Sequence, residues 1–105
     1  MSPYDCGLLL EKIYKGTLIS PEYSSEMLSL LKQQKRRNKI PYLLPDDVVC
    51  ANKTGETSNI QSDVGIVFSP ACDYIICVIT NNAGSGISDI RNISEITYRY
   101  FNQNL

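Results

Sequence analysis

Residues 48–79 read VVCANKTGETSNIQSDVGIVFSPACDYIICVI, and this stretch decides the fold. It contains three short apolar runs separated by residues that favour turns, a pattern typical of β-strands. The runs are Val48–Ala51, Val64–Phe68 and Tyr74–Ile79, and the connections between them are short enough for antiparallel hairpins. The third run is apolar on both faces of the predicted strand, so we expect both of its faces to be covered.

Two helices are predicted before the strands, because Ser2-Pro3 and Ser20-Pro21 each place a serine at the N-cap and a proline at the first helical position. Gly16 is expected to end the first helix as the glycine after its C-cap. The second helix is expected to extend into the basic run 35–39 and to be ended by Pro41. The apolar residues expected on the inner faces of these helices are Cys6, Leu9, Leu10, Ile13, Met27, Leu28, Leu30 and Leu31.

A third helix is predicted after the strands, from about Ser88 to Asn102. Its expected apolar stripe consists of Ile90, Ile93, Ile96 or Thr97, and Tyr100 or Phe101. The order of elements is helix, helix, three strands, helix. It indicates an α+β fold, in which two N-terminal helices and one C-terminal helix accompany a three-stranded antiparallel sheet.

Length and charge exclude several classes of protein. The chain has 105 residues, which is one domain at most, since domains commonly have about 100–200 residues. A net charge of −1 and an isoelectric point near 5.3 exclude a nucleic-acid binder driven by overall positive charge. The longest apolar run, 74–79, is far shorter than the roughly 20 residues of a membrane span. We therefore expect neither nucleic acid nor a membrane span, and we find no pattern of a secretion signal.

Histidine is absent from the sequence, which excludes a Ser-His-Asp triad, a Cys/His zinc site and a haem held by histidine. The four cysteines, Cys6, Cys50, Cys72 and Cys77, include no C-x-x-C pair. Two disulfides are possible, but a chain of this length can form a core without them. We expect four free thiols packed as small apolar side chains, no metal and no cofactor.

One short motif carries chemistry. The triplet Lys53-Thr54-Gly55 lies at the end of the first predicted strand. A three-residue motif often occurs by chance. The alternative to a functional site is therefore a surface turn between two strands, in which Lys53 is solvated. The neighbouring sequence favours a functional site, because the motif follows Ile40-Pro41 and Leu44-Pro45 and precedes Asp63-Val-Gly-Ile-Val67.

With these neighbours, the chain resembles the C-terminal part of the class A β-lactamases and their penicillin-recognising relatives, whose signatures include K-T-G. The resemblance covers nearly all of the 105 residues, which are less than half of a family member. It implies that residues 1–105 form a single partial domain of that fold. The further matching segments are Ser2-Pro3-Tyr4-Asp5, Met27–Leu31, Gln34, Ala51–Glu56 and the closing amphipathic helix.

The resemblance implies that residues 53–56 bind the substrate. Lys53 would place a positive charge near the carboxylate of a β-lactam or of a D-alanyl-D-alanine peptide, and Thr54 would donate a hydrogen bond to that carboxylate. Gly55 would leave the strand edge bare for the substrate backbone. The backbone N–H of Glu56 would be one of two donors of an oxyanion hole.

The catalytic residues that the resemblance implies are not complete in this chain. Its one S-x-x-K match, Ser29–Lys32, lies on the second predicted helix, so we interpret it as a chance match. No S-D-N is present, because the nearest segments, Ser62-Asp63-Val64 and Ser88-Asp89-Ile90, both lack the asparagine. We expect the chain to be inactive alone and to supply the side of a serine hydrolase active site that carries the K-T-G motif. The alternative is a non-catalytic binding module derived from the same fold.

Two further expectations concern surfaces. The basic residues Lys32, Lys35, Arg36, Arg37 and Lys39 are interpreted as the solvated end of the second helix, where the helix dipole favours cations. The resemblance implies that the strand 74–79 normally pairs with a strand that this chain lacks, which would leave an unprotected sheet edge. We therefore expect a homodimer or a companion N-terminal part. The resemblance implies a place of action outside the cytoplasm, and the compartment stays open.

Overall fold

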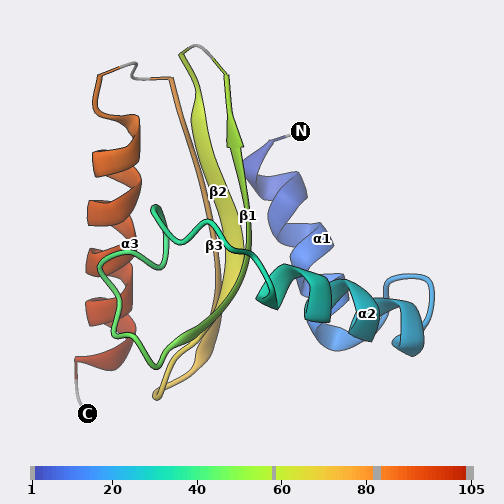
Figure 1. The fold of residues 1–105 in the computed structure, drawn as a ribbon. Helices are drawn as coiled ribbons and strands as arrows, with labels where there is room; N and C mark the ends of the chain where they lie inside the picture. Colours follow the sequence, from blue (N-terminus) through green and yellow to red (C-terminus); the bar gives the residue numbers. More distant parts are fainter. Residues whose placement is uncertain (1, 58, 82–83, 104–105) are drawn as a thin grey trace.

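An antiparallel sheet forms the middle layer of the molecule in the computed structural model, which describes residues 2–57, 59–81 and 84–103 (Figure 1). Within these residues the sheet has the strand order β1-β2-β3. The helices α1 and α2 cover one face of the sheet, and α3 covers the other (Figure 1). The elements are α1 (Pro3–Lys15), α2 (Pro21–Lys32), β1 (Val49–Glu56), β2 (Gln61–Phe68), β3 (Asp73–Thr80) and α3 (Gly86–Asn102). The predicted α+β order is confirmed.

Both predicted helix starts are confirmed. The Ser2 hydroxyl accepts the N–H of Asp5 at 3.1 Å, and the Asp5 side chain accepts the N–H of Ser2, which forms a capping box. The Ser20 hydroxyl accepts the N–H of Tyr23 at 3.0 Å. Gly16 follows α1 with a φ of 76°, the left-handed conformation that favours glycine.

The predicted end of the second helix is wrong. α2 ends at Lys32 and does not extend into the basic run 35–39. In a continued helix, the N–H of Arg36 would bond to the carbonyl of Lys32. It donates instead to the side-chain oxygen of Gln34 at 3.2 Å, and this local bond competes with the helical one.

Two apolar clusters hold the layers together. The smaller cluster joins Leu10 of α1 to Ala51 and Ile66 of the sheet. The larger cluster lies on the opposite face, where the segment 40–48 and α3 pack on the strands. Its buried members are Ile40, Leu44, Val48, Cys50, Val67, Tyr74, Ile76 and Ile90. At about 25 cal/mol per Å² of apolar area removed from water, such burial is the main force that stabilises the layers.

The expectation that β3 would be covered on both faces is only half right. Tyr74 and Ile76 are buried against α3, whereas Ile75 and Ile79 on the other face are 36% and 41% exposed. β3 pairs only with β2 within the described residues, so its outer side is open. Side chains next to an open edge lack a neighbouring strand to cover them.

The predicted stripe of the last helix is also only partly right. Ile90 is buried, and Thr97, the alternative to Ile96, is half-buried. Ile93, Ile96, Tyr100 and Phe101 are exposed, although the Phe101 ring stacks on the buried Tyr74 with 4.8 Å between ring centres. The helix is turned so that Ser94 faces the core, because the Ser94 hydroxyl donates to the Ile40 carbonyl at 2.7 Å. Leu9 of α1 and Leu30 of α2 are likewise exposed, contrary to expectation.

All four cysteines lie in the described part of the chain and are free, as expected. Burial raises the pKa of the Cys50 and Cys77 thiols to about 11, which makes both poor nucleophiles at neutral pH. Cys72 is exposed, so it does not pack as a small apolar side chain. No helix in the described ranges is long and apolar enough to cross a membrane.

Candidate functional site on the open edge of the first strand

The residues Lys53, Thr54, Gly55 and Glu56 form the second half of β1. Within the described residues β1 pairs on one side only, with β2, so its other side is an open edge. The structure therefore brings the four predicted site residues to one edge of the sheet. A segment of ligand backbone can pair with such an edge.

The backbone groups that face this open edge follow from the hairpin register. The N–H of Thr57 donates to the carbonyl of Ile60 at 2.9 Å, so these two residues are a hydrogen-bonded pair. Such pairs alternate along an antiparallel ladder, and Gly55 with Ser62 is therefore the next one. Thr54 and Glu56 then direct their N–H and carbonyl groups away from β2. The N–H of Glu56, for which the family resemblance implies a role in an oxyanion hole, thus faces outward.

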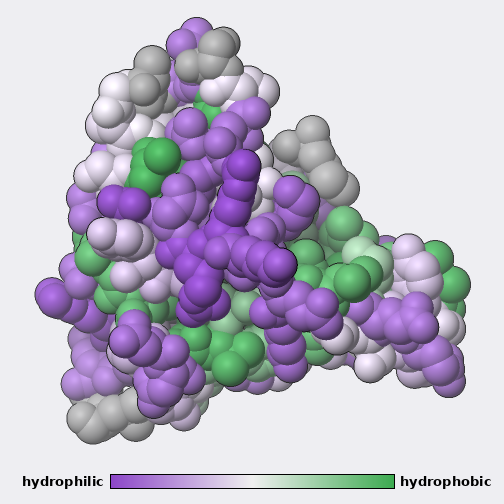
Figure 2. All heavy atoms as spheres, in the orientation of Figure 1, coloured by the Kyte–Doolittle hydropathy of each residue, from purple (hydrophilic) through white to green (hydrophobic). Residues whose placement is uncertain are grey.

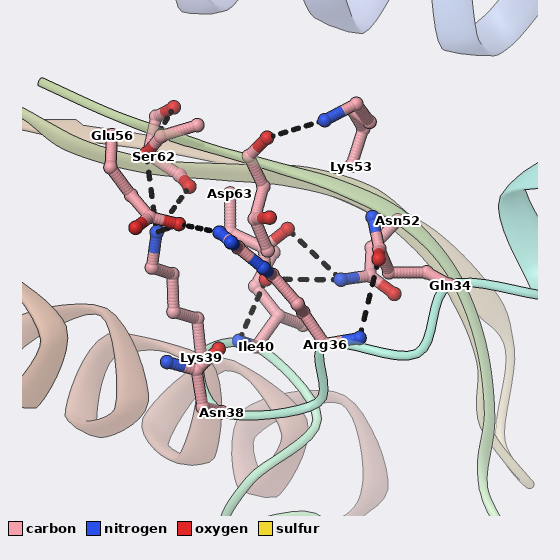
Figure 3. A network of polar contacts seen from close by, with 12 residues as sticks. Gln34, Arg36, Asn38, Lys39, Ile40, Asn52, Lys53, Glu56, Ser62 and Asp63 are labelled. Carbon is pink, nitrogen blue, oxygen red and sulfur yellow. Dashed lines mark hydrogen bonds and ion pairs between the residues drawn. The ribbon is translucent and has the colours of Figure 1, made fainter.

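The side chains of Lys53 and Thr54 lie on opposite faces of the sheet, because successive side chains of a strand alternate. Lys53 shares the face of Ala51, beneath α1 and α2, and is exposed. Its ammonium donates to the carbonyl of Thr54 at 2.8 Å (Figure 3). Thr54 lies on the other face and is 6% exposed. The two side chains therefore do not converge from the same face.

The absence of a side chain at Gly55 also has a structural reason within the sheet. A Cβ atom at this position would lie 2.7 Å from the Ser62 hydroxyl oxygen. That hydroxyl donates to the Gly55 carbonyl at 3.3 Å. The missing side chain thus makes room for Ser62 of the neighbouring strand.

The basic segment 35–39 lies over this part of the sheet and is not the end of a helix. The expectation that its charges are solvated holds for Lys35, Arg36 and Arg37, which are exposed, and is wrong for Lys39. Arg36 pairs with the carboxylate of Glu56 (Figure 3). Lys39 is fully buried, and its ammonium donates to the carbonyls of Gly55 and Ser62, at 3.2 Å each. Its nitrogen is also 3.7 Å from a carboxylate oxygen of Glu56. The sequence showed the cluster of charges but not its place beside residues 53–56.

A buried carboxylate fixes the same segment from within. Asp63 is fully buried and accepts the N–H of Ile40 at 2.9 Å and the side-chain amide of Asn52 at 3.0 Å (Figure 3). Burial raises the pKa of the Asp63 carboxyl above its usual range, whereas the hydrogen bonds from Asn52 and Ile40 and the charge of Lys39 lower it. Asp63 therefore joins β2 to β1 and to the segment that follows α2.

The surface over this region is polar. Figure 2 shows hydrophilic residues gathered across the middle of the face on which the segment after α2 crosses the strands in Figure 1. Arg36 and Glu56 both belong to this exposed surface. An anionic group that approached the open edge of β1 would therefore meet charged side chains before it reached the backbone.

The S-x-x-K match shows no sign of an activated nucleophile. Ser29 is exposed and accepts the side-chain amide of Gln33 at 3.3 Å. The ammonium of Lys32 lies 4.7 Å from the centre of the Phe68 ring. Neither contact activates the Ser29 hydroxyl, which agrees with its interpretation as a chance match.

The sequence model of a family described as "Beta-lactamase enzyme family" matches residues 1–101. No curated protein matches the chain. The chain is similar to PBP-A, at 25% identity and a TM-score of 0.91, over 98% of this chain and 40% of that one.

Two more solved structures show the same fold. A β-lactamase from Sphaerobacter thermophilus is 24% identical, with a TM-score of 0.89 over 97% of this chain and 41% of that one. A mutant of PBP-A in an acyl-enzyme complex with penicillin G is 24% identical, with a TM-score of 0.87 over 98% of this chain and 40% of that one. The chain thus spans about 40% of the length of the structures that it matches.

Proposed function

The chain belongs to the β-lactamase enzyme family. We propose that it supplies two parts of a serine hydrolase active site: the residues that bind the carboxylate of the substrate, and one hydrogen-bond donor of the oxyanion hole. The substrate would be a β-lactam or a D-alanyl-D-alanine peptide. The complete site would acylate a serine and then hydrolyse the acyl-enzyme. This chain would be the C-terminal portion of that site and would not carry the nucleophile.

The open edge of β1 is the observation that carries the proposal. The exposed ammonium of Lys53 supplies the charge for a carboxylate, and the outward N–H of Glu56 supplies a donor for a developing oxyanion. Thr54 is 6% exposed on the opposite face, so its hydroxyl would have to turn toward the edge of the strand to donate to that carboxylate. A substrate amide could pair with the outward backbone groups of the same strand, which aligns it with these donors.

A non-catalytic binding module is the second candidate, and the edge itself favours it. Pairing of a peptide with β1 and capture of its carboxylate by Lys53 require no nucleophile. The two candidates differ in one respect, because only a hydrolase needs an activated serine from outside residues 1–105.

The first prediction concerns activity of the isolated chain. Residues 1–105 alone should not hydrolyse a chromogenic β-lactam above the rate in buffer, because within the described residues the Ser29 hydroxyl is hydrogen-bonded only to the Gln33 amide, which is not a base. The measurement is the absorbance change at micromolar chain, with Ser29→Ala as the matched variant. Hydrolysis that disappears in Ser29→Ala would contradict the proposal that the nucleophile lies elsewhere.

The second prediction concerns the open edge of β3. Alternation along the ladder directs the backbone groups of Ile75, Cys77 and Ile79 away from β2. These residues form an apolar edge without Lys or Pro, which favours pairing with another strand. We propose that a second copy of the chain or a companion chain covers this edge. Residues 1–105 alone should then sediment as a two-fold dimer at micromolar concentration.

A charged substitution tests whether dimer formation depends on the edge of β3 or on any exposed apolar residue. Ile75→Lys should shift the chain toward monomer, whereas Ile60→Lys, at an equally exposed isoleucine between β1 and β2, should not. A clean monomer whose amides at Ile75 and Cys77 are strongly protected from exchange would show that the edge is covered internally.

A further inference from the structure

Lys39 has an environment that is costly for a lysine. Its side chain has an exposed fraction of 0%, and its ammonium donates to two backbone carbonyls, those of Gly55 and Ser62. A buried ammonium is expensive unless its charge is compensated. The carboxylate of Glu56, 3.7 Å away and 40% exposed, gives part of that compensation. An apolar residue could fill the same space with a smaller desolvation free energy. The presence of a lysine here therefore indicates that the ammonium has a specific role at this position.

The carbonyl of Gly55 and the N–H of Glu56 belong to one peptide group. The described chain has no cis peptide bond, so these two groups point in opposite directions. The carbonyl points toward β2 and the ammonium of Lys39, and the N–H points to the open edge of β1. Lys39 therefore contacts one end of the dipole whose other end is the proposed oxyanion donor.

We propose that Lys39 is a positioning residue, which fixes the Gly55–Glu56 peptide group and polarises it so that the N–H of Glu56 becomes a stronger donor. This inference rests on the proposed function of that N–H. A hydrogen bond from a charged donor is about twice as strong as a neutral one, and linked hydrogen bonds strengthen each other. The second bond of Lys39, to Ser62, fixes the peptide against the neighbouring strand.

Hydrogen exchange distinguishes polarisation from simple support. Hydroxide removes the proton of an exposed amide and leaves a negative peptide group, which a nearby ammonium stabilises. In Lys39→Gln, which keeps a donor but loses the charge, exchange at Glu56 should become about tenfold slower, the effect of a one-unit rise in the amide pKa. Lys39→Arg, which keeps the charge, should restore a rate within about twofold of the original.

The measurement is residue-resolved exchange by NMR on residues 1–105, with no substrate present. Lys35→Met is the matched control, because it removes one exposed charge from the same segment. Faster exchange at both Glu56 and Ser62 in Lys39→Gln would show structural support alone and would overturn the proposal. An unchanged rate at Glu56 in a folded Lys39→Gln chain would overturn it as well. If Lys39→Gln does not fold, Lys39→Met, which also removes the charge, is measured in its place with the same expected slowing at Glu56.

The kinetic test keeps this inference separate from the proposed function. It uses the completed protein, in which residues 1–105 are joined to the part of the Sphaerobacter thermophilus β-lactamase that they do not cover. There Lys39→Gln should lower kcat about tenfold with little change in KM, because the oxyanion donor acts in the transition state. If Lys53→Ala has no effect on the activity of that protein but exchange at Glu56 is slower in Lys39→Gln, the proposed function is wrong and the effect of Lys39 on the peptide group still stands. If Lys53→Ala lowers activity and Lys39→Gln changes neither exchange nor kcat, only the role of Lys39 fails.

Discussion

Replacing Lys53 with alanine in the completed protein should lower kcat/KM for penicillin G about 100-fold or more. Lys53 is exposed at the open edge of β1, where its charge can reach a ligand carboxylate. Within the described residues, its ammonium donates only to the carbonyl of its own neighbour, Thr54. The substitution therefore removes a charge from the site without removing a buried contact.

The matched control is Lys35→Ala, an exposed lysine of the segment after α2. It should leave kcat/KM within about twofold, because Lys35 is exposed, makes no hydrogen bond or ion pair with residues 53–56 among the described residues, and its charge is screened by solvent. Steady-state hydrolysis of penicillin G measures both variants. Equal kinetics for Lys53→Ala and the original protein would remove Lys53 from the site.

Replacing Asp63 with alanine should lower the free energy of unfolding of the chain by about 3 kcal/mol. Asp63 is fully buried and accepts hydrogen bonds from Ile40 and Asn52. Its loss leaves those donors unpaired and removes a negative charge that faces Lys39. A loss of this size is a large part of the 5–15 kcal/mol that holds a typical domain.

Urea denaturation at pH 7 measures this effect, with the exposed Asp47→Ala as the control. The midpoint should shift in Asp63→Ala while the slope stays the same. A shift no larger than that of Asp47→Ala would show that the buried network contributes little to stability.

The loss of unfolding free energy in Asp63→Ala should depend on pH in a definite direction. The pKa of Asp63 is raised in the folded chain, so the folded state binds this proton more tightly than the unfolded state. The contribution of Asp63 to stability is therefore complete below its unfolded pKa and falls as the pH rises through the folded pKa. The penalty of Asp63→Ala, relative to Asp47→Ala, should be larger at pH 4 than at pH 7.

The sequence predicts those parts of the fold that depend on local chemistry. The serine and proline pairs at the starts of α1 and α2, Gly16 after α1 and the three apolar runs all specify their structure within a few residues. The end of α2 was missed because the Arg36 N–H donates to the side-chain oxygen of Gln34 in place of the helical hydrogen bond. The inner face of α3 was missed because a distant hydroxyl contact, from Ser94 to Ile40, sets the rotation of the helix.

The candidate site, too, has parts that depend on the local sequence and parts that depend on contacts between distant residues. The motif at residues 53–56 is a continuous stretch, so its place on a strand could be predicted from the sequence, whereas its role in binding stays a prediction. The contact of Lys39 with Gly55 spans 16 residues, and that of Asp63 with Ile40 spans 23. No spacing rule connects such positions. A lysine in a basic run is usually solvated, and only the tertiary structure shows that Lys39 is buried.

The most direct test of the account compares penicillin G with its methyl ester, which lacks the negative charge, as substrates of the completed protein and of its Lys53→Ala variant. A site that recognises the carboxylate should prefer the free acid about 100-fold in kcat/KM. If Lys53 carries that recognition, the preference should fall to within about tenfold in Lys53→Ala, because the two changes remove the same interaction. A preference for the acid that is equally large in both proteins would contradict the assignment of the carboxylate site to β1.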